Sequence, residues 1–319
     1  MDQHRVPVLL GIPLAVLGGL AVAGQGRING ALGARLDDGL AAAAISFGSG
    51  LILILAVSLA SPSGRSGLRA IGPALKARKF PRWYVTAGAV GAFLVLTQGL
   101  TVAVIGIALF TVALVTGQSL SGLLVDRLGI SPAGKKPITG IRVISAVLTI
   151  AAVIWAVSPR FAQAGDASHW LFPVLLPLAA GFLMSFQQAM NGMQSLHYGT
   201  PLAATVMNFA VGAVILLLAW LVKVWISGVG NPLPGEWWYY LGGALGCFFI
   251  CLSAWLVRGL GVLLTGLGMI AGPLLGSLAL DLIVPTPGTV IAPATWLGTL
   301  LTLLAMVLAT LPWPRKPLR

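Results

Sequence analysis

Hydrophobic residues follow one another along this chain in stretches of about 20, with short polar segments between them. A helix needs about 20 apolar residues to cross the hydrocarbon core of a bilayer. A strand of a membrane β-barrel would alternate apolar and polar residues over about 10 positions, and no segment shows that alternation. The pattern therefore predicts an all-α integral membrane protein. We expect ten transmembrane helices, near residues 7–33, 39–60, 83–104, 107–126, 138–158, 170–195, 202–225, 238–257, 260–282 and 293–312.

Two blocks of residues within these spans occur twice. The first block recurs after 162 residues and the second after 155 residues. The first contains Gly19, Gln25, Asn29, Gly30, Leu40, Ala41, Ala42, Phe47 and Gly50, which return as Gly181, Gln187, Asn191, Gly192, Leu202, Ala203, Ala204, Phe209 and Gly212. The second contains Trp83, Tyr84, Gly88, Gly91, Phe93, Gly106, Gly117 and Asp126, which return as Trp238, Tyr239, Gly243, Gly246, Phe248, Gly261, Gly272 and Asp281. The chain therefore divides into two five-helix halves, residues 1–160 and 161–319. Duplicated halves are typical of secondary transporters, whose binding site lies near the midplane between the repeats.

The composition also points to a membrane protein. Hydrophobic residues make up 58% of the chain and charged residues only 8%, and the mean hydropathy is +0.98. Soluble domains contain roughly 25% charged residues. The first apolar stretch resembles a signal peptide, but its copy near 170–195 lies in the middle of the chain, so we expect a retained helix.

The net charge of +12 favours a defined orientation over a nucleic-acid partner. Nucleic acid is bound by a stripe of Lys and Arg with exposed aromatic residues, whereas here the basic residues lie in segments between spans. With the amino terminus inside, fifteen basic residues fall in cytoplasmic segments and only three, Arg35, Arg160 and Lys223, in outer loops. Under the positive-inside rule this bias predicts that both termini are cytoplasmic.

The same bias predicts that the second half is inverted relative to the first. Each half has an odd number of spans, so loops that correspond by sequence must face opposite sides of the membrane. The segment 61–82 is rich in Lys and Arg, and its counterpart 226–237 has none. The segment 127–137 carries three basic residues, and its counterpart 283–292 is uncharged. We therefore expect two inverted-topology five-helix repeats.

Polar side chains inside spans are costly in hydrocarbon, so they normally face a cavity or a partner. The polar residues of the first hairpin of each half are Gln25, Asn29, Ser46, Gln187, Gln188, Asn191 and Asn208. In an inverted arrangement these hairpins face each other near the midplane, where amides, which both donate and accept hydrogen bonds, would line a site for a small polar solute. Alternatively, the amides bond neighbouring helices, at about 0.6–2 kcal/mol each. Helix bonding is the stronger explanation for Gln98 and Gln194.

Arg27 is the only basic residue well inside a predicted span, and Ala189 occupies the equivalent position. Three interpretations remain open. Arg27 extends to the outer interface, or it pairs with Asp281, which the topology also places near the outer face, or it binds an anionic group of the substrate.

No acidic residue falls at the centre of a predicted span. This argues against an exchange of protons for cationic drugs at a carboxylate in mid-membrane. Asp126 and Asp281 recur at the end of the fourth helix of each half, and they are the candidates for a titrating pair that couples transport to protons. The alternative is that both residues bond to loop or backbone groups at helix ends.

The remaining reactive groups indicate no catalytic or metal site. Cys247 and Cys251 are four residues apart on one helix, which suits neither a disulfide nor, without further soft ligands, a zinc site. His4, His169 and His197 form no cluster. The chain has no Walker-type phosphate loop and no Ser/His/Asp constellation. We therefore expect no enzyme activity, no cofactor and no use of ATP.

Two motifs carry a family resemblance. The hairpin Gln25-Gly-Arg-Ile-Asn29-Gly-Ala-Leu-Gly33 continues into Leu40-Ala-Ala-Ala-Ala-Ile-Ser-Phe-Gly-Ser-Gly50, and Gly117-Gln118 is followed by Asp126-Arg-Leu-Gly129. These motifs resemble the YdcZ-like branch of inner-membrane exporters in the drug/metabolite transporter superfamily. The second half departs from them, because Pro273 replaces the counterpart of Gln118 and Asp281 is followed by Leu-Ile-Val. The resemblance spans nearly the whole chain and implies outward transport of a small solute across a bacterial inner membrane, without naming the substrate.

Together these features predict a secondary transporter that moves a small polar or amphipathic metabolite by alternating access. A solute that binds both states equally does not bias their exchange, so a gradient of the substrate or of a coupled ion must set the direction. One alternative is a lipid-headgroup flippase, with Arg27 and the amides on a groove open to lipid. Another is a non-transporting scaffold or sensor, with all amides used in helix–helix bonds. The oligomeric state stays open, since a fused chain already contains both halves.

Overall fold

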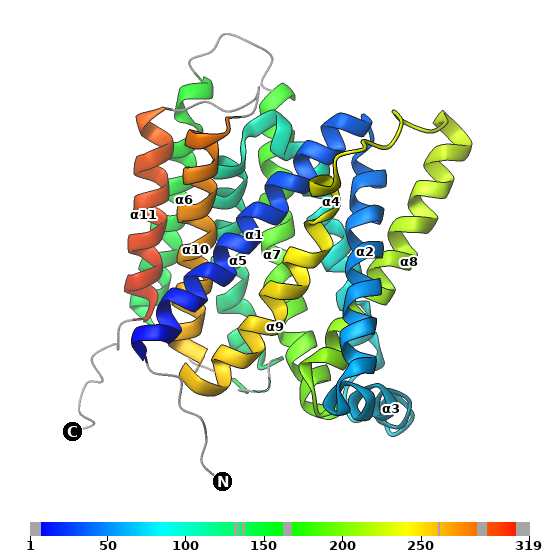
Figure 1. Ribbon diagram of the computed structural model, residues 1–319. Helices are drawn as coiled ribbons and strands as arrows, with labels where there is room; N and C mark the ends of the chain where they lie inside the picture. The colour runs from blue at the N-terminus through cyan, green and yellow to red at the C-terminus, as the bar shows by residue number, and fades with distance from the viewer. Residues whose placement is uncertain are drawn as a thin grey trace, which may run out of the picture.

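The computed structural model describes residues 8–130, 132, 134–135, 138–161, 168–260, 262–285 and 292–310. Within these residues the regular elements are all helical, and no strand is present (Figure 1). The α-helices are α1 (Val8–Leu36), α2 (Gly39–Ala60), α3 (Pro62–Lys76), α4 (Ala87–Ile105), α5 (Ile107–Leu128), α6 (Gly140–Phe161), α7 (Ser168–Tyr198), α8 (Pro201–Ser227), α9 (Gly242–Leu260), α10 (Val262–Ile283) and α11 (Pro293–Thr310). The two short 3-10 helices are η1 (Arg82–Thr86) and η2 (Trp237–Tyr240).

Each segment expected to span the membrane coincides with one of these helices, with ends that differ by a few residues. The segments 83–104 and 238–257 begin in η1 and η2, where the repeated Trp-Tyr pairs lie. Among the described residues, five helical stretches are long and apolar enough to cross a membrane, and three shorter helices are also apolar. The five long stretches are Gly39–Ala60, Arg82–Ile105, Ile107–Leu128, Leu171–Tyr198 and Pro201–Ser227.

Helix α3 was not expected from the sequence, where the segment 61–82 reads as a basic loop. Ser61 begins the helix, because its side chain accepts a hydrogen bond from the Gly64 N–H at 3.0 Å and Pro62 follows at the first helical position. Gly67 packs against the α7–α8 connection, where Thr200 lies. The helix is too short and too polar to resemble a span. Its position is fixed by this contact, by the packing of Gly64 on Ser58 of α2, and by Ala74, which is buried in an apolar cluster with Tyr198 and Ala203.

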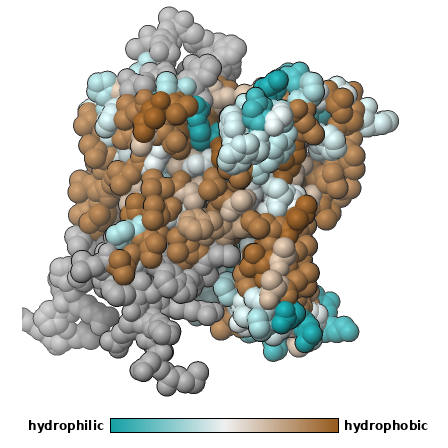
Figure 2. Space-filling view, viewed as in Figure 1, coloured by the Kyte–Doolittle hydropathy of each residue, from teal (hydrophilic) through white to brown (hydrophobic). Residues whose placement is uncertain are grey.

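A belt of exposed apolar side chains surrounds the bundle. Trp225 is 86% exposed, Ile52 73% and Ile226 69%. In Figure 2 hydrophobic atoms cover the middle of the visible face, and hydrophilic atoms gather towards its two ends. Soluble monomers rarely expose apolar patches of more than a few hundred Å², so this surface is that of a membrane protein.

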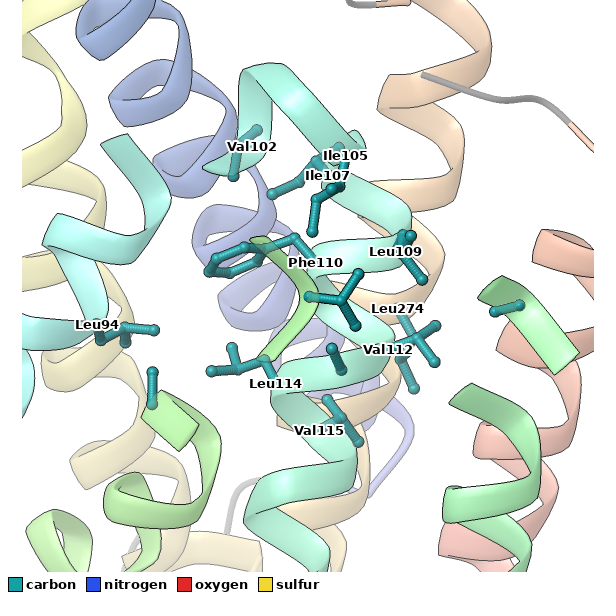
Figure 3. Packing of buried hydrophobic residues seen from close by; sticks show 14 residues of the cluster. Leu94, Val102, Ile105, Ile107, Leu109, Phe110, Val112, Leu114, Val115 and Leu274 are labelled. Carbon is teal, nitrogen blue, oxygen red and sulfur yellow. The ribbon is translucent and has the colours of Figure 1, made fainter. Parts of the chain in front are cut away.

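Helix α5 lies at the centre of the bundle. Every residue from Ile107 to Gly117 is buried. Phe110, Val112 and Leu114 pack with Leu274 of α10 in the largest apolar cluster of the described residues (Figure 3). Such an apolar helix surrounded by other helices is shielded from lipid, so the close contacts of α5 with its neighbours fix the positions of the helices that carry the polar side chains.

The helix contacts fall into pairs that relate the two halves. Helix α1 packs on α10, and α7 packs on α5; α1 also packs on α9, and α7 on α4. Helices α2 and α8 contact each other, as do α6 and α11. Glycine permits the closest of these approaches: a Cβ on Gly19 would lie 2.6 Å from the Cα of Gly272, and a Cβ on Gly181 would overlap the carbonyl of Leu114.

Helix α1 and its repeat copy α7 run in opposite directions (Figure 1). Helix α1 ends at the upper side of the bundle in Figure 1, and α7 ends at the lower side, beside α3. At the upper side, the Asn231 N–H donates to the Leu36 carbonyl at the end of α1. The start of α1 and the end of α11 both lie at the lower side (Figure 1).

Candidate functional site

Four polar side chains of the first half form what we call the first amide cluster: Gln25, Asn29, Ser46 and Gln98. Asn29 Nδ2 donates to Gln98 Oε1 at 2.7 Å, which joins α1 to α4. Gln25 is 9% exposed, Asn29 0%, Ser46 3% and Gln98 1%. The cluster is therefore buried from solvent on all sides. This bond between α1 and α4 agrees with the helix-bonding interpretation of Gln98, and its partner is Asn29, a residue expected at the site.

Two glycines of helix α9, Gly242 and Gly246, pack against the first amide cluster. A Cβ on Gly246 would lie 2.7 Å from Gln25 Nε2, and a Cβ on Gly242 would overlap Asn29 Oδ1. Even so, Asn29 Oδ1 and Ser46 Oγ have no hydrogen-bond partner within the described part of the chain. A buried polar atom without a partner costs about 1–3 kcal/mol, so this cluster keeps two acceptors that another group can satisfy.

The second amide cluster consists of Gln187, Asn191 and Asn208. Gln187 Nε2 and Asn191 Nδ2 both donate to Asn208 Oδ1, at 2.9 Å and 3.3 Å, and join α7 to α8. Gly91 of α4 covers this cluster, since a Cβ there would lie 2.6 Å from Gln187 Nε2. Gly91 and Gly246 are repeat copies, so each cluster meets a glycine from the other half.

The two clusters do not merge into one ring. Between the described residues no hydrogen bond joins the two clusters, and Gly91 and Gln98 lie seven residues apart, about 10 Å along α4. Between the hairpins stand Phe47 and Phe209, whose ring centroids are 5.0 Å apart. Phe209 lies against Gly50, three residues after Phe47, and Phe47 lies against Gly212, three residues after Phe209.

The second cluster is the more accessible one. Asn191 is half-buried and Gln188 is exposed. Gln188 Oε1 accepts a hydrogen bond from Gln118 Nε2 of α5 at 3.2 Å. Of the residues expected at the site, Gln188 is therefore the one whose amide faces open space.

Arg27 lies away from both clusters, towards the C-terminal end of α1. Its Nη2 donates to the carbonyl of Val284 at 2.5 Å, and its Nη1 is buried without a hydrogen-bond partner among the residues described. Asp281 acts on Arg27 electrostatically, but no ion pair within 4.0 Å joins the two side chains in the described structure.

Asp281 instead caps the N-terminus of α5. Its Oδ1 accepts from the Ile107 N–H at 3.2 Å and its Oδ2 from the Ala108 N–H at 2.8 Å. Gly106, the residue before Ile107, has a φ of +79°. A residue with a side chain would be strained in this conformation, so glycine permits the tight turn from α4 into α5. Backbone N–H groups and the helix dipole both favour a carboxylate here.

Asp126, the repeat copy of Asp281, has a different partner. It forms an ion pair of 2.5 Å with Arg142 of α6, and the two side chains are 19% and 26% exposed. The two aspartates therefore do not meet in this structure, and each bonds a group near a helix end.

A third aspartate, at the start of α2, joins the two halves. Asp38 Oδ2 accepts from Lys223 Nζ at 2.9 Å and from Trp220 Nε1 at 3.3 Å, and Oδ1 accepts from the Ala41 N–H. Burial works to raise the pKa of Asp38, but these hydrogen bonds and the charge of Lys223 outweigh it and hold that pKa below its ordinary value. Lys223 had been counted only as an outer-loop charge.

The described residues contain no group of three or more His, Cys, Asp and Glu that could hold a metal ion. Cys247 is buried, with its Sγ 3.4 Å from the Gly50 carbonyl. His197 stacks on Phe80. His4 and the side chains of His169 and Cys251 lie outside the described residues.

Comparisons with known proteins give a family and a similar fold. The family described as "Putative inner membrane exporter, YdcZ" matches residues 10–155 and, a second time, residues 172–308. One solved structure, described only as the crystal structure of a protein, is 20% identical in sequence and superimposes with a TM-score of 0.58 over 95% of this chain and 96% of that chain. That likeness concerns the fold alone. No match was found among curated proteins.

Proposed function

Because the chain belongs to the YdcZ family of inner membrane exporters, we propose that it carries a small polar or amphipathic solute across the membrane by alternating access. Its ten long helices would cross the bilayer as two inverted five-helix repeats, with both termini in the cytoplasm. The paired helix contacts and the distribution of basic residues support this arrangement.

The unequal exposure of the two amide clusters carries the proposal. They are built from repeat copies, yet Asn29 is 0% exposed and its copy Asn191 is half-buried beside the exposed Gln188. In an inverted-repeat carrier, the two halves adopt different conformations and exchange them between the inward and outward states. A fully buried first cluster and a second cluster that is more exposed at Asn191 are what one such state would present.

The side of the opening supports an inward-facing state. Gln188 lies towards the end of α7 that packs beside α3, where the basic residues of 61–82 gather. Under the positive-inside rule that side is cytoplasmic. At the opposite side, Asp281 joins α10 to α5 and Asp38 joins α2 to α8. These contacts would have to break for the outer side to open.

The unpartnered polar atoms argue against a scaffold whose amides serve only to join helices. Asn29 Oδ1, Ser46 Oγ and Asn191 Oδ1 are buried, and none has a hydrogen-bond partner in the described structure; outside the clusters the same holds for Gln194 Oε1. A purely structural network is normally satisfied, because each unmade bond is costly. A solute would form hydrogen bonds with such atoms while it is bound and would leave them unpaired when it is released.

The test is uptake by purified protein in liposomes, after a thermal-shift screen of metabolites has identified a ligand. We expect Asn191→Ala to lower the uptake rate at least tenfold, because it removes a cluster amide. The matched control is Gln194→Ala, which removes a buried amide from the same helix that bonds the Tyr84 carbonyl outside both clusters. Equal rates for the two variants would refute a role for the cluster.

The same liposomes distinguish the alternatives. A flippase would move fluorescent lipid between leaflets, and Asn191→Ala would slow that movement. A scaffold would move neither solute nor lipid. A carrier moves the solute and leaves the lipid in place.

A further inference from the structure

Gln118 and Gln188 form an amide pair that neither the repeat nor the clusters explain. Gln118 Nε2 donates to Gln188 Oε1 at 3.2 Å, and the backbone carbonyl of Gln118 accepts from Ser185 Oγ at 2.9 Å. Gln188 is exposed and Gln118 half-buried. The pair therefore keeps an acceptor, Gln118 Oε1, and a donor, Gln188 Nε2, available to a ligand.

The amide of Gln188 faces helix α5, where it bonds Gln118. The large apolar side chains exposed on α7 are Leu171 (43%), Phe172 (63%), Leu175 (47%), Phe182 (38%), Leu183 (39%) and Leu196 (61%). At 3.6 residues per turn, Gln188 lies roughly 120–160° around the helix from Phe172, Leu175, Phe182 and Leu183, and roughly 80–100° from Leu171 and Leu196. An amide in hydrocarbon without partners is costly, so an exposed glutamine on the inner face of α7 indicates water between the helices.

There is room beside the pair. A Cβ on Gly122, one turn after Gln118, would meet only Ser185 Oγ, at 3.8 Å. Asn191 follows Gln188 by three residues on the same side of α7, and its Oδ1 is buried without a hydrogen-bond partner among the described residues. The pair thus lies beside open space and continues into the second amide cluster.

The corresponding place in the other half is closed. The repeat copies of Gln188 and Gln118 are Gly26 and Pro273, and both are buried. A Cβ on Gly26 would lie 2.7 Å from Ile107, and Pro273 packs directly on Gly19. Because the fold is built without an amide pair there, the pair on α5 and α7 is not a requirement of the architecture.

The surroundings of the pair define the charge of the ligand. In the described structure the side-chain hydrogen bonds of Gln118, Gln188 and the second cluster join an amide to an amide. A charged solute would give up its hydration here without a counter-charge, which is unfavourable. An uncharged solute with a donor and an acceptor side by side would satisfy the free groups.

Resting on the carrier function above, we propose that Gln118 and Gln188 are the specificity site of the inward-facing state and that they select an uncharged carboxamide. A primary carboxamide offers one acceptor and two donors in one plane. It can bond the free Gln188 Nε2 and Gln118 Oε1 together, whereas a carboxylate offers no donor and an ammonium no acceptor.

The test uses thiol labelling in a variant with Cys247 and Cys251 replaced by Ala. Gly122→Cys puts a thiol beside the pair and keeps both glutamines, and an impermeant maleimide is applied to inside-out vesicles. Leu183→Cys, exposed on the apolar side of α7, is the control for lipid-facing positions. Three four-carbon probes are compared: succinamide, succinate and 1,4-diaminobutane, which are neutral, anionic and cationic.

We expect Gly122→Cys to react at least tenfold faster than Leu183→Cys. Succinamide should slow that reaction at least threefold, the two charged probes less than twofold, and Gln188→Leu should remove the protection. Protection by a charged probe as strong as that by succinamide, protection that survives Gln188→Leu, or no protection at all would overturn the specificity site while leaving the carrier intact. Labelling of Gly122→Cys as slow as that of Leu183→Cys would overturn both, because no water would reach the second cluster.

Discussion

Replacing Asp281 with Asn changes one of the two acceptor atoms at the N-terminus of α5. The carboxylate accepts from two backbone N–H groups, with Oδ2 2.8 Å from the Ala108 nitrogen. An asparagine has one oxygen and one NH₂ group, so the NH₂ must face one of the two N–H donors. That donor then loses its partner inside the bundle, where Asp281 is 5% exposed.

The magnitude follows from two terms. A buried donor left without a partner costs about 1–3 kcal/mol. The lost charge at a partly buried helix N-terminus adds up to about 2 kcal/mol. These terms overlap, and we expect a loss of about 2–3 kcal/mol in the free energy of unfolding.

Asp126→Asn is the matched control, because it makes the same chemical change at the repeat copy. The ion pair of Asp126 with Arg142 is partly exposed to solvent, and such a pair contributes less than about 1 kcal/mol. In thermal unfolding of the detergent-solubilised protein, at roughly 2 °C per kcal/mol, Asp281→Asn should lower the midpoint by about 4–6 °C. Asp126→Asn should lower it by less than about 2 °C. Equal shifts, or a larger shift for Asp126→Asn, would refute the capping role of Asp281.

Three further outcomes are expected. Gly19→Ala should destabilise the protein by about 1–3 kcal/mol because the new methyl group overlaps α10, whereas Gly48→Ala, with nothing within 4 Å, should not; thermal unfolding checks both. Asp38→Asn should lose stability at pH 7, and its difference from the wild type should vanish as the pH falls through the depressed pKa of Asp38, below its ordinary value of 3.8; Asp37→Asn, at an exposed position, should not lose stability at pH 7. If the role of Asp281 is structural, the pH dependence of transport per folded molecule should be the same for Asp281→Asn and the wild type, and a changed profile would instead indicate proton coupling.

The helices could be predicted because lipid imposes a length and an apolar composition on each crossing segment. Those constraints say nothing of α3, which is short and polar and is held by the contact of Gly67 with the α7–α8 connection. Helix α3 therefore became visible only with the tertiary structure.

The candidate site was predictable in part. The spacing of Gln25 and Asn29 places them on one helix face, but the partner Gln98 and the covering Gly242 come from distant helices, and sequence spacing does not reveal such contacts. The repeat directed attention to residues that the halves share. Gln118, which has no polar copy, was for that reason noted only as part of a motif.

Two inverted halves are the arrangement on which the carrier mechanism depends, and membrane topology measures it directly. In the variant without native cysteines, Ser66→Cys lies on α3 and Val229→Cys, 72% exposed, lies in the corresponding segment of the second half. With an impermeant thiol reagent on right-side-out and inside-out vesicles, Ser66→Cys should react only from the cytoplasmic side and Val229→Cys only from the outer side. Reaction of both residues from the same side would contradict the inverted arrangement and the alternating access built on it.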